Sequence, residues 1–144
     1  MNNLRYKLVI SEEELKEALD VRKKVFIEEQ HISQQLDLDG RDEEALHIVV
    51  KDGDSVVATA RVLLVDDERA KIERMAILQP YRRKGIGRKI ISFLVEWLKE
   101  RQVDEVFVHA QYPVRGFYRS VGFEEQPPPF REANIKHVRM RKIL

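Results

Sequence analysis

The sequence predicts an α+β fold in which a mostly antiparallel mixed sheet has helices on both faces. Two segments, near 12–30 and 87–101, have the apolar spacing of helices. Three β-branched runs between 46 and 77 are joined by connections short enough for antiparallel pairing. The runs 70–77 and 103–110 flank the second helix, so a crossover must make these two strands parallel.

Length and composition limit the class of protein. The 144 residues suit one compact domain, so we expect a single domain over 1–144. Hydrophobic residues at 43% and charged residues at 35% are typical of a globular chain. Cysteine is absent, which excludes catalysis through an acyl-cysteine. The chain has no apolar span and no signal-peptide pattern, so we expect a cytoplasmic location and no membrane partner.

The first third predicts a strand, a helix and a loop. Arg5–Ile10 is the strand candidate, and Ser11 with Glu14 forms a capping box that starts the helix. The helical spacing continues to about Gln30. Residues 31–45 lack periodicity and contain an acidic cluster, which predicts a loop with room for a short helical turn.

The middle of the chain predicts an antiparallel meander. Its strands are Leu46–Lys51, Ser55–Val65 and Ala70–Ile77, and Asp52-Gly53-Asp54 has the composition of a hairpin turn between the first two. Pro80 ends the third strand, because proline has no amide hydrogen to continue the pairing. The second long helix follows.

The last third predicts two strands around a short helix. Val103–Ala110 is the first strand, and Pro113–Val121 is a short helix that Gly122 closes with a left-handed cap. Pro127-Pro128-Pro129 predicts a stiff loop. His137–Ile143 is the final strand.

Segment 79–88 places two glycines and many cations before the second helix. Gly85 and Gly87 permit close backbone approaches, and the helix start offers unpaired amides at its positive end. Five cations lie within eight residues: Arg82, Arg83, Lys84, Arg88 and Lys89. Together these features predict a site for a ligand with several phosphates.

Other uses of this segment are excluded or less favoured. A dinucleotide fingerprint needs a third glycine where Ile90 stands, and a Walker loop needs a Gly-Lys-Ser/Thr ending that is missing. A solvated basic helix start stays open as an alternative. We expect no nucleic-acid partner, because the net charge is only +1 and no aromatic residue lies within 82–89.

Two blocks of sequence carry a family resemblance. Arg82-x-x-Gly85-x-Gly87 between a strand and a helix resembles the acyl-CoA pyrophosphate loop of the GNAT superfamily of N-acetyltransferases. Ala110-Gln111, Phe117-Tyr118 and Gly122-Phe123 follow in the order of that family's later motif. The helix Val-Arg-x-x-Val-Phe-x-x-Glu-Gln over 21–30 is similar to a small bacterial YjcF-like subgroup.

The resemblance implies a fold, a reaction and a co-substrate. The parallel strands would be splayed where the pantetheine arm of acetyl-CoA enters, and no metal is implied. An acetyl group would pass directly to a primary amine of a small molecule or peptide. A non-catalytic acyl-CoA sensor of the same fold is the alternative. The implied cofactor-binding residues are Met75, Ala76, Ile77, Arg82, Arg83, Lys84, Gly85, Ile86, Gly87, Arg88, Gln111, Phe117 and Tyr118.

The resemblance also implies catalytic roles. Tyr118 matches the family's general acid; the alternative is a tyrosine packed beneath Phe117. An alkylammonium must lose a proton before it attacks, and Glu73 is the first candidate base because strand alternation would put it on one face with Met75 and Ile77. The alternative for Glu73 is a structural ion pair with Arg74 or another surface cation.

Further candidates are less specific. His47 is a second candidate base, with a suitable intrinsic pKa, although a lone histidine on a strand is more often structural. Asp37 and Asp39 in the acidic loop would attract a cationic acceptor, although charged loops are usually only solvated. The remaining histidines lack metal-ligand spacing, so we expect no metal site. Dimerisation through the final strands stays open.

Overall fold

The structure, a computed structural model, describes residues 3–144 and contains one seven-stranded sheet in the order β1-β2-β3-β4-β5-β7-β6. Only β4 and β5 are parallel, and all other neighbours are antiparallel, which confirms the predicted mixed sheet. The strands are β1 (Leu4–Leu8), β2 (Leu46–Asp52), β3 (Ser55–Leu64), β4 (Arg69–Ile77), β5 (Glu105–Gln111), β6 (Glu124–Glu132) and β7 (Ile135–Ile143).

The first helix starts where the sequence predicts. Ser11 Oγ accepts a hydrogen bond from the Glu14 amide at 3.1 Å, and Glu14 Oε1 accepts one from the Ile10 amide at 3.1 Å. A π-helical segment continues this helix to Glu29, with Gln30 as its cap, and the predicted short turn in the acidic loop is α2. The helices are α1 (Glu12–Arg22), η1 (π-helix, Lys23–Glu29), α2 (Gln34–Asp37), η2 (3₁₀, Gln79–Tyr81), α3 (Ile86–Glu100), η3 (3₁₀, Tyr112–Val114) and α4 (Arg115–Ser120).

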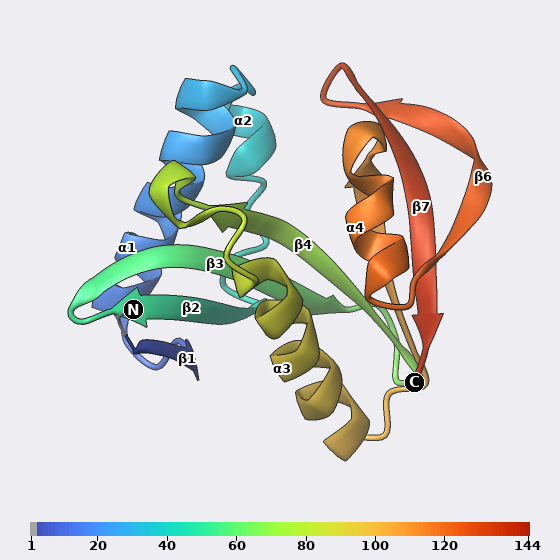
Figure 1. Cartoon of the computed structure of the whole chain (residues 1–144), viewed down its shortest axis with the longest axis horizontal. Coiled ribbons are helices and arrows are strands. Elements are labelled where there is room, and N and C mark those ends of the chain that lie inside the picture. Colours follow the sequence, from blue (N-terminus) through green and yellow to red (C-terminus); the bar gives the residue numbers. More distant parts are fainter. Residues whose placement is uncertain (1–2) are drawn as a thin grey trace.

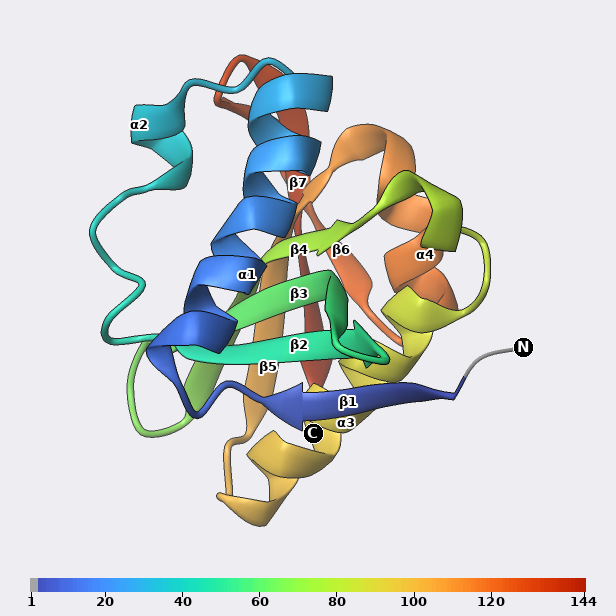
Figure 2. The same ribbon diagram turned by 90° about the vertical axis from the view of Figure 1, so that its left-hand side faces the viewer.

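Helices cover both faces of the sheet, as predicted. Figure 2 shows α1 lying across β3 and β4 on the near side, with α3 behind the strands. Alternation along β2 divides the core accordingly: Val49 packs with Ala18 and Val21 of α1, whereas Ile48 packs in the cluster that contains Leu94 of α3. Each face of the sheet therefore has its own apolar core.

The predicted loop at Pro127-Pro128-Pro129 is wrong, because these residues lie within β6. This strand is at the edge of the sheet, and its pairing with β7 is interrupted between Gln126 and Phe130. Proline cannot donate to a ladder, but at a sheet edge and within an irregular stretch no donor is needed. The chain thus pairs on either side of the prolines.

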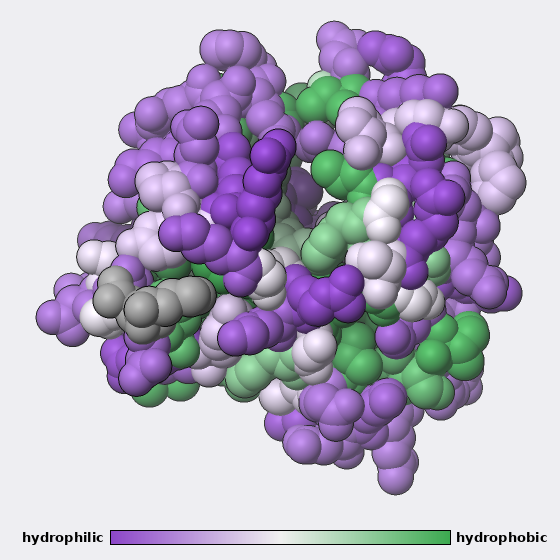
Figure 3. Space-filling model, in the orientation of Figure 1, coloured by the Kyte–Doolittle hydropathy of each residue, from purple (hydrophilic) through white to green (hydrophobic). Residues whose placement is uncertain are grey.

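The parallel pair is splayed. β4 and β5 pair only where Arg69–Lys71 faces Glu105–Phe107, and no further β4–β5 pairs follow in the described chain. Figure 1 shows the consequence: the half that contains α1, α2 and β2–β4 diverges from the half that contains α4, β6 and β7. The space-filling view shows a hollow between these halves (Figure 3).

A bulge in β4 accompanies the splay. Glu73 pairs with Arg61 and Ala76 pairs with Thr59, so Arg74 and Met75 together face the single residue between these partners on β3. Arg74 has a φ of 55°, which is uncommon for a residue with a side chain. The bulge bends β4 at the point where it separates from β5.

The bulge also changes which side chains share a face. Glu73 lies on the α1 face with its partner Arg61, whereas Met75 and Ile77 pack against the core on the α3 face. The predicted common face of Glu73, Met75 and Ile77 is therefore wrong. Strict alternation holds only for a regular strand, and the extra residue reverses it.

Candidate active site

The glycine-bearing loop turns sharply into α3. Gly85 has a φ of 82° and caps the helix, a backbone conformation that side chains disfavour. The Lys89 amide donates to the Gly85 carbonyl at 3.2 Å as the first bond of the helix. The amides of Ile86, Gly87 and Arg88 therefore precede the intrahelical bonding, and they face the loop with the positive end of the helix dipole.

The loop cations are mostly left without anionic partners. Arg82 is the exception: Nη2 lies 2.9 and 3.0 Å from the Glu29 carboxylate oxygens, and Nε donates to the Ile77 carbonyl at 2.8 Å. Across residues 3–144, no carboxylate forms an ion pair with the other four, which are Arg83, Lys84, Arg88 and Lys89. The loop therefore remains positively charged and suits an anion.

The two sequence motifs meet at Gly87. A Cβ atom at this position would lie 3.1 Å from Phe117 Cζ, which is closer than such contacts normally allow. Glycine thus lets the first turn of α3 pack on the ring of Phe117 in α4. The adjacent Tyr118 ring packs edge to face between Phe117 and Phe123, with centroid separations of 5.1 and 5.6 Å.

The Tyr118 hydroxyl is available as a donor. Within the described residues, nothing forms a hydrogen bond with it, although the ring is packed on both sides. Burial raises the pKa of Tyr118, so the phenol stays protonated at neutral pH. The arrangement gives the site a hydrogen-bond donor and no phenolate.

The gap between the diverging ends of β4 and β5, called the slot below, has polar contacts at its border. Gln111, at the end of β5, donates from Nε2 to Gln30 Oε1 at 2.8 Å. Ile77 offers its carbonyl to Arg82, so that oxygen is already engaged. The Ala76 side chain is buried against α1, and Met75 packs on the opposite face of β4.

The acidic loop forms a buried charge network with arginines. Arg61 on β3 has no exposed surface, and its Nη1 and Nη2 donate to the two Asp39 oxygens at 2.9 and 2.7 Å. The same guanidinium donates to Asp42 at 3.0 Å and to Glu73 at 3.0 Å. Arg22 of α1 donates to Asp42 at 2.6 Å. The hydrogen bonds from Arg61 lower the pKa of Asp39 far below its usual range.

The remaining contacts tie the loop to β4. The Arg74 guanidinium lies 3.3 Å from the Asp37 carboxylate and donates to the Leu36 carbonyl at 2.9 Å. Glu73 pairs with Lys71 at 2.8 Å as well as with Arg61. Burial opposes ionisation of Glu73, but these cations lower its pKa overall. The acidic loop is thus neutralised internally.

The network changes the interpretation of several predicted site residues. Asp37 and Asp39 bind buried arginines, so the structure does not place them as attractants for a cationic acceptor. Glu73 likewise forms ion pairs with Arg61 and Lys71, which is the structural role given above as the alternative to a catalytic base. His47 Nε2 lies 2.8 Å from the Asp42 carbonyl, and burial lowers the pKa of His47. These four residues therefore stabilise the α1 face.

Apart from the pair of Arg74 with Glu73, which lies at 3.9 Å, the arginines of the network were missed from the sequence. One signal was present: Arg61 interrupts an apolar run, Val56 to Leu63, whose other residues pack well in a sheet. A charge at the centre of such a strand is costly unless partners are supplied. The nearby acidic loop supplied them.

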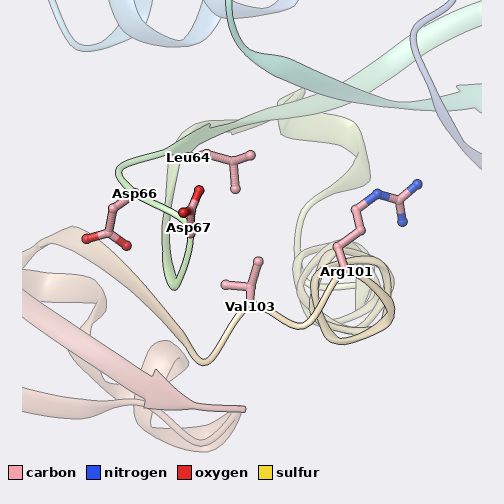
Figure 4. Close-up of a pocket in the computed structure, with 5 residues that line it drawn as sticks. All are labelled: Leu64, Asp66, Asp67, Arg101 and Val103. Atoms are coloured by element: carbon pink, nitrogen blue, oxygen red, sulfur yellow. The ribbon is translucent and has the colours of Figure 1, made fainter.

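The pocket in Figure 4 lies at the other end of the parallel strands. Its lining comes from the β3–β4 turn and the α3–β5 connection, where Asp67 and Arg101 lie near Leu64 and Val103. None of the predicted site residues is there. In the described part of the chain, no cluster of histidine and acidic residues could hold a metal, and no helix could cross a membrane.

Comparison with known proteins decides the family. A model described as "Acetyltransferase (GNAT) domain" matches residues 9–144. The chain belongs to this GNAT acetyltransferase family. The chain is 39% identical to YyaT of Bacillus subtilis over 98% of this chain and 97% of that protein. It is also 32% identical to YjcF, an N-acetyltransferase of the same organism, over 92% and 94% of the two chains, which confirms the predicted subgroup.

Solved structures agree with the GNAT fold. A Lactobacillus plantarum protein has a TM-score of 0.93 at 25% identity, over 99% of both chains. A GNAT acetyltransferase of Elizabethkingia anophelis with acetyl-CoA bound has a TM-score of 0.78 at 14% identity, over 100% of both chains. The second likeness shows the fold alone.

The free energy of unfolding of this protein should depend strongly on Arg61. Arg61→Met would leave three carboxylates with no central cation, and we expect a loss of about 3–5 kcal/mol in the free energy of unfolding. Urea denaturation measures this loss. Arg41→Met is the matched control, because Arg41 is exposed and, within the described chain, its side chain forms an ion pair with Glu44 alone. Its effect should stay below about 1 kcal/mol. Equal unfolding midpoints for the two variants would contradict the network.

Stability should also fall on acidification through His47. Its pKa lies below the reference value of 6.5 in the folded state, so the unfolded chain binds more protons once the pH drops below 6.5. The loss is at most about 1.4 kcal/mol per pH unit for one proton. His47→Gln should flatten the curve between about pH 6.5 and 5, where carboxylates do not yet contribute.

The control for His47 is His31→Asn. His31 is exposed, and asparagine tolerates its φ of 57°. This variant should keep the wild-type slope. Below about pH 4.5 all three proteins should lose stability together, since the pKa values of Asp39 and Glu73 are lowered on folding. An unchanged slope in His47→Gln would show that His47 is not held neutral.

Proposed function

We propose that this protein is an acetyl-CoA-dependent N-acetyltransferase that transfers an acetyl group directly to a primary amine of a small molecule or peptide. One observation carries the proposal: the gap between β4 and β5 opens beside a glycine-bearing loop whose cations are mostly unpaired. Family membership supports acyl transfer, and a protein of the same fold holds acetyl-CoA.

The residues present fit acetyl-CoA. The amides of Gly85, Ile86, Gly87 and Arg88 would hold its phosphates together with the side chains of the unpaired cations. Arg82 can join them once it leaves Glu29, an exposed pair that costs little to break. Beyond Lys71 the backbone of β4 has no partner on β5, so Met75 and Ala76 can pair with the pantetheine amides instead. When bound, the thioester supplies the activated acetyl group.

Tyr118 would assist departure of the thiol through a hydrogen bond. The reference pKa values of a phenol and a thiol are about 10 and 8.5, so full proton transfer to the thiolate is uphill by about 2 kcal/mol. Burial raises the pKa of Tyr118 and makes that transfer less favourable still. A donor held protonated can nevertheless stabilise charge that develops on sulfur.

The loop assignment predicts the effect of Gly87→Glu. The new side chain would collide with Phe117 and bring negative charge to the phosphate position. We expect acetyl-CoA to bind at least about tenfold more weakly by calorimetry, a loss of about 1.4 kcal/mol. Ser92→Glu adds the same charge at an exposed position of α3 and should leave the Kd within about twofold. Equal affinity in Gly87→Glu and wild type would remove the phosphate loop from the proposal.

The catalytic assignment predicts the effect of Tyr118→Phe. Loss of the hydroxyl should lower kcat by about 10²-fold while the Kd for acetyl-CoA stays within about twofold. Thiol release with a panel of primary amines measures the rate. Tyr112→Phe is the control, because its ring can still stack with Arg115 and Lys136. Normal turnover in Tyr118→Phe would show that Tyr118 serves packing alone. If the wild-type protein binds acetyl-CoA but transfers acetyl to no amine, the sensor alternative is favoured.

A further inference from the structure

We infer that His109 and Glu132 form a catalytic dyad in which His109 Nε2 removes the proton from the acceptor amine. The inference rests on the proposed function. An alkylamine has a pKa of about 10.4, so it is almost entirely protonated at neutral pH and cannot attack a thioester until a base takes its proton. Glu73 and His47 are both committed to the buried network.

The hydrogen bond between the two side chains fixes the proton on one ring nitrogen. His109 Nδ1 lies 3.1 Å from Glu132 Oε1. The bond to His109 lowers the pKa of Glu132, so the carboxylate is ionised and can only accept. Nδ1 must therefore carry a hydrogen, and neutral His109 presents a lone pair on Nε2. No group among residues 3–144 forms a hydrogen bond with Nε2.

The imidazole is held in place and still accessible. The Phe130 ring meets it edge on at 4.9 Å, and the Phe107 ring lies at 6.0 Å. The His109 side chain keeps 25% of its surface exposed. A base needs both properties, because it must be oriented by its neighbours and must also reach the substrate.

His109 stands where the slot begins. The last parallel pair joins Lys71 to Phe107, and His109 is the next residue of β5 on the same face. Gln111 follows on that face and donates a hydrogen bond to Gln30, the residue that caps η1, so this face of β5 is turned toward the half that contains α1. Tyr118 packs in the core cluster of α3, on the opposite face. The acid and the base would therefore approach the thioester from different sides.

Charged and aromatic side chains from β4, β5 and β7 surround the dyad. Arg139 pairs directly with His109 across β5 and β7, and its guanidinium covers Phe107 at 3.9 Å. His137 Nε2 lies 3.8 Å from the second oxygen of Glu132, and Lys71 of β4 also acts on that carboxylate. The Glu132 carboxylate thus faces both histidines, and Lys71 adds a positive charge on the β4 side.

The proposed step balances. The acceptor ammonium gives one proton to His109 Nε2 and keeps the electron pair on nitrogen. That pair forms the C–N bond to the thioester carbonyl carbon, and the C–S bond breaks with its electron pair on sulfur. The second proton lost from nitrogen neutralises the thiolate, whose charge Tyr118 stabilises meanwhile. His109 returns its proton to water, so the products are one amide, one thiol and one proton.

The test compares His109→Gln, Glu132→Gln and wild type over a range of pH. An alkylamine acceptor from the panel and hydroxylamine, which is largely unprotonated at neutral pH, serve as probes, with thiol release as the readout. With the alkylamine at pH 7, we expect His109→Gln to lose about 10²-fold in kcat/KM and Glu132→Gln to lose less. The deficit should shrink as the pH approaches the amine pKa. With hydroxylamine, the variants should stay within about threefold of wild type.

Controls separate a structural role from a catalytic one. His31→Asn removes an exposed imidazole and should match wild type. Acetyl-CoA affinity and unfolding midpoint should be unchanged in His109→Gln, and an equal, pH-independent loss with both probes would overturn the dyad. Wild-type rates in His109→Gln would also overturn it. If wild type transfers to no amine at all, the proposed function fails, and the inference fails with it.

Discussion

The bulge at Arg74 and Met75 is the constraint on which the site depends. Two residues of β4 face one residue of β3, so β4 bends away from β5 after only three parallel pairs. A positive φ at Arg74 costs about 1 kcal/mol or more, which surrounding contacts must offset. The Arg74 guanidinium provides such contacts through the Leu36 carbonyl and the Asp37 carboxylate. The buried network thus holds the strand in the shape that opens the slot.

The net charge of +1 includes the charges of an acidic loop and a basic loop, and the fold neutralises only the acidic one. The acidic loop meets Arg22, Arg61 and Arg74 and is neutralised inside the fold. In the basic loop, Arg82 pairs with Glu29, and its other cations have no carboxylate partner among residues 3–144. Ion pairs neutralise the acidic loop and leave most of the basic loop charged. The electrostatic potential at the start of α3 is therefore positive, although the net charge of the chain is close to zero. This asymmetry is a property of the fold and could not be read from composition.

Local patterns predicted the elements that depend on local chemistry. The turn at Asp52-Gly53-Asp54, the cap at Ser11 and the glycines before α3 each have a signature within a few residues. The bulge had none, since no glycine marks Arg74, and assuming a regular strand put Glu73 on the wrong face. The partners of Arg61 are 12 to 22 residues away in sequence, so only the tertiary structure could assign them. Three consecutive prolines led to the prediction of a loop in place of β6, so Glu132 was not predicted to lie on a strand beside β7.

The prolines of β6 also determine which way Glu132 points. Gln126 faces Arg139 and Phe130 faces His137, so four steps along β6 correspond to two along β7. The excess is two residues, and alternation has a period of two, so Phe130 and Glu132 stay on the face that carries His109. An excess of one would turn the carboxylate to the other side of the sheet. The contact between Glu132 and His109 therefore requires that the number of extra residues in β6, relative to β7, is even.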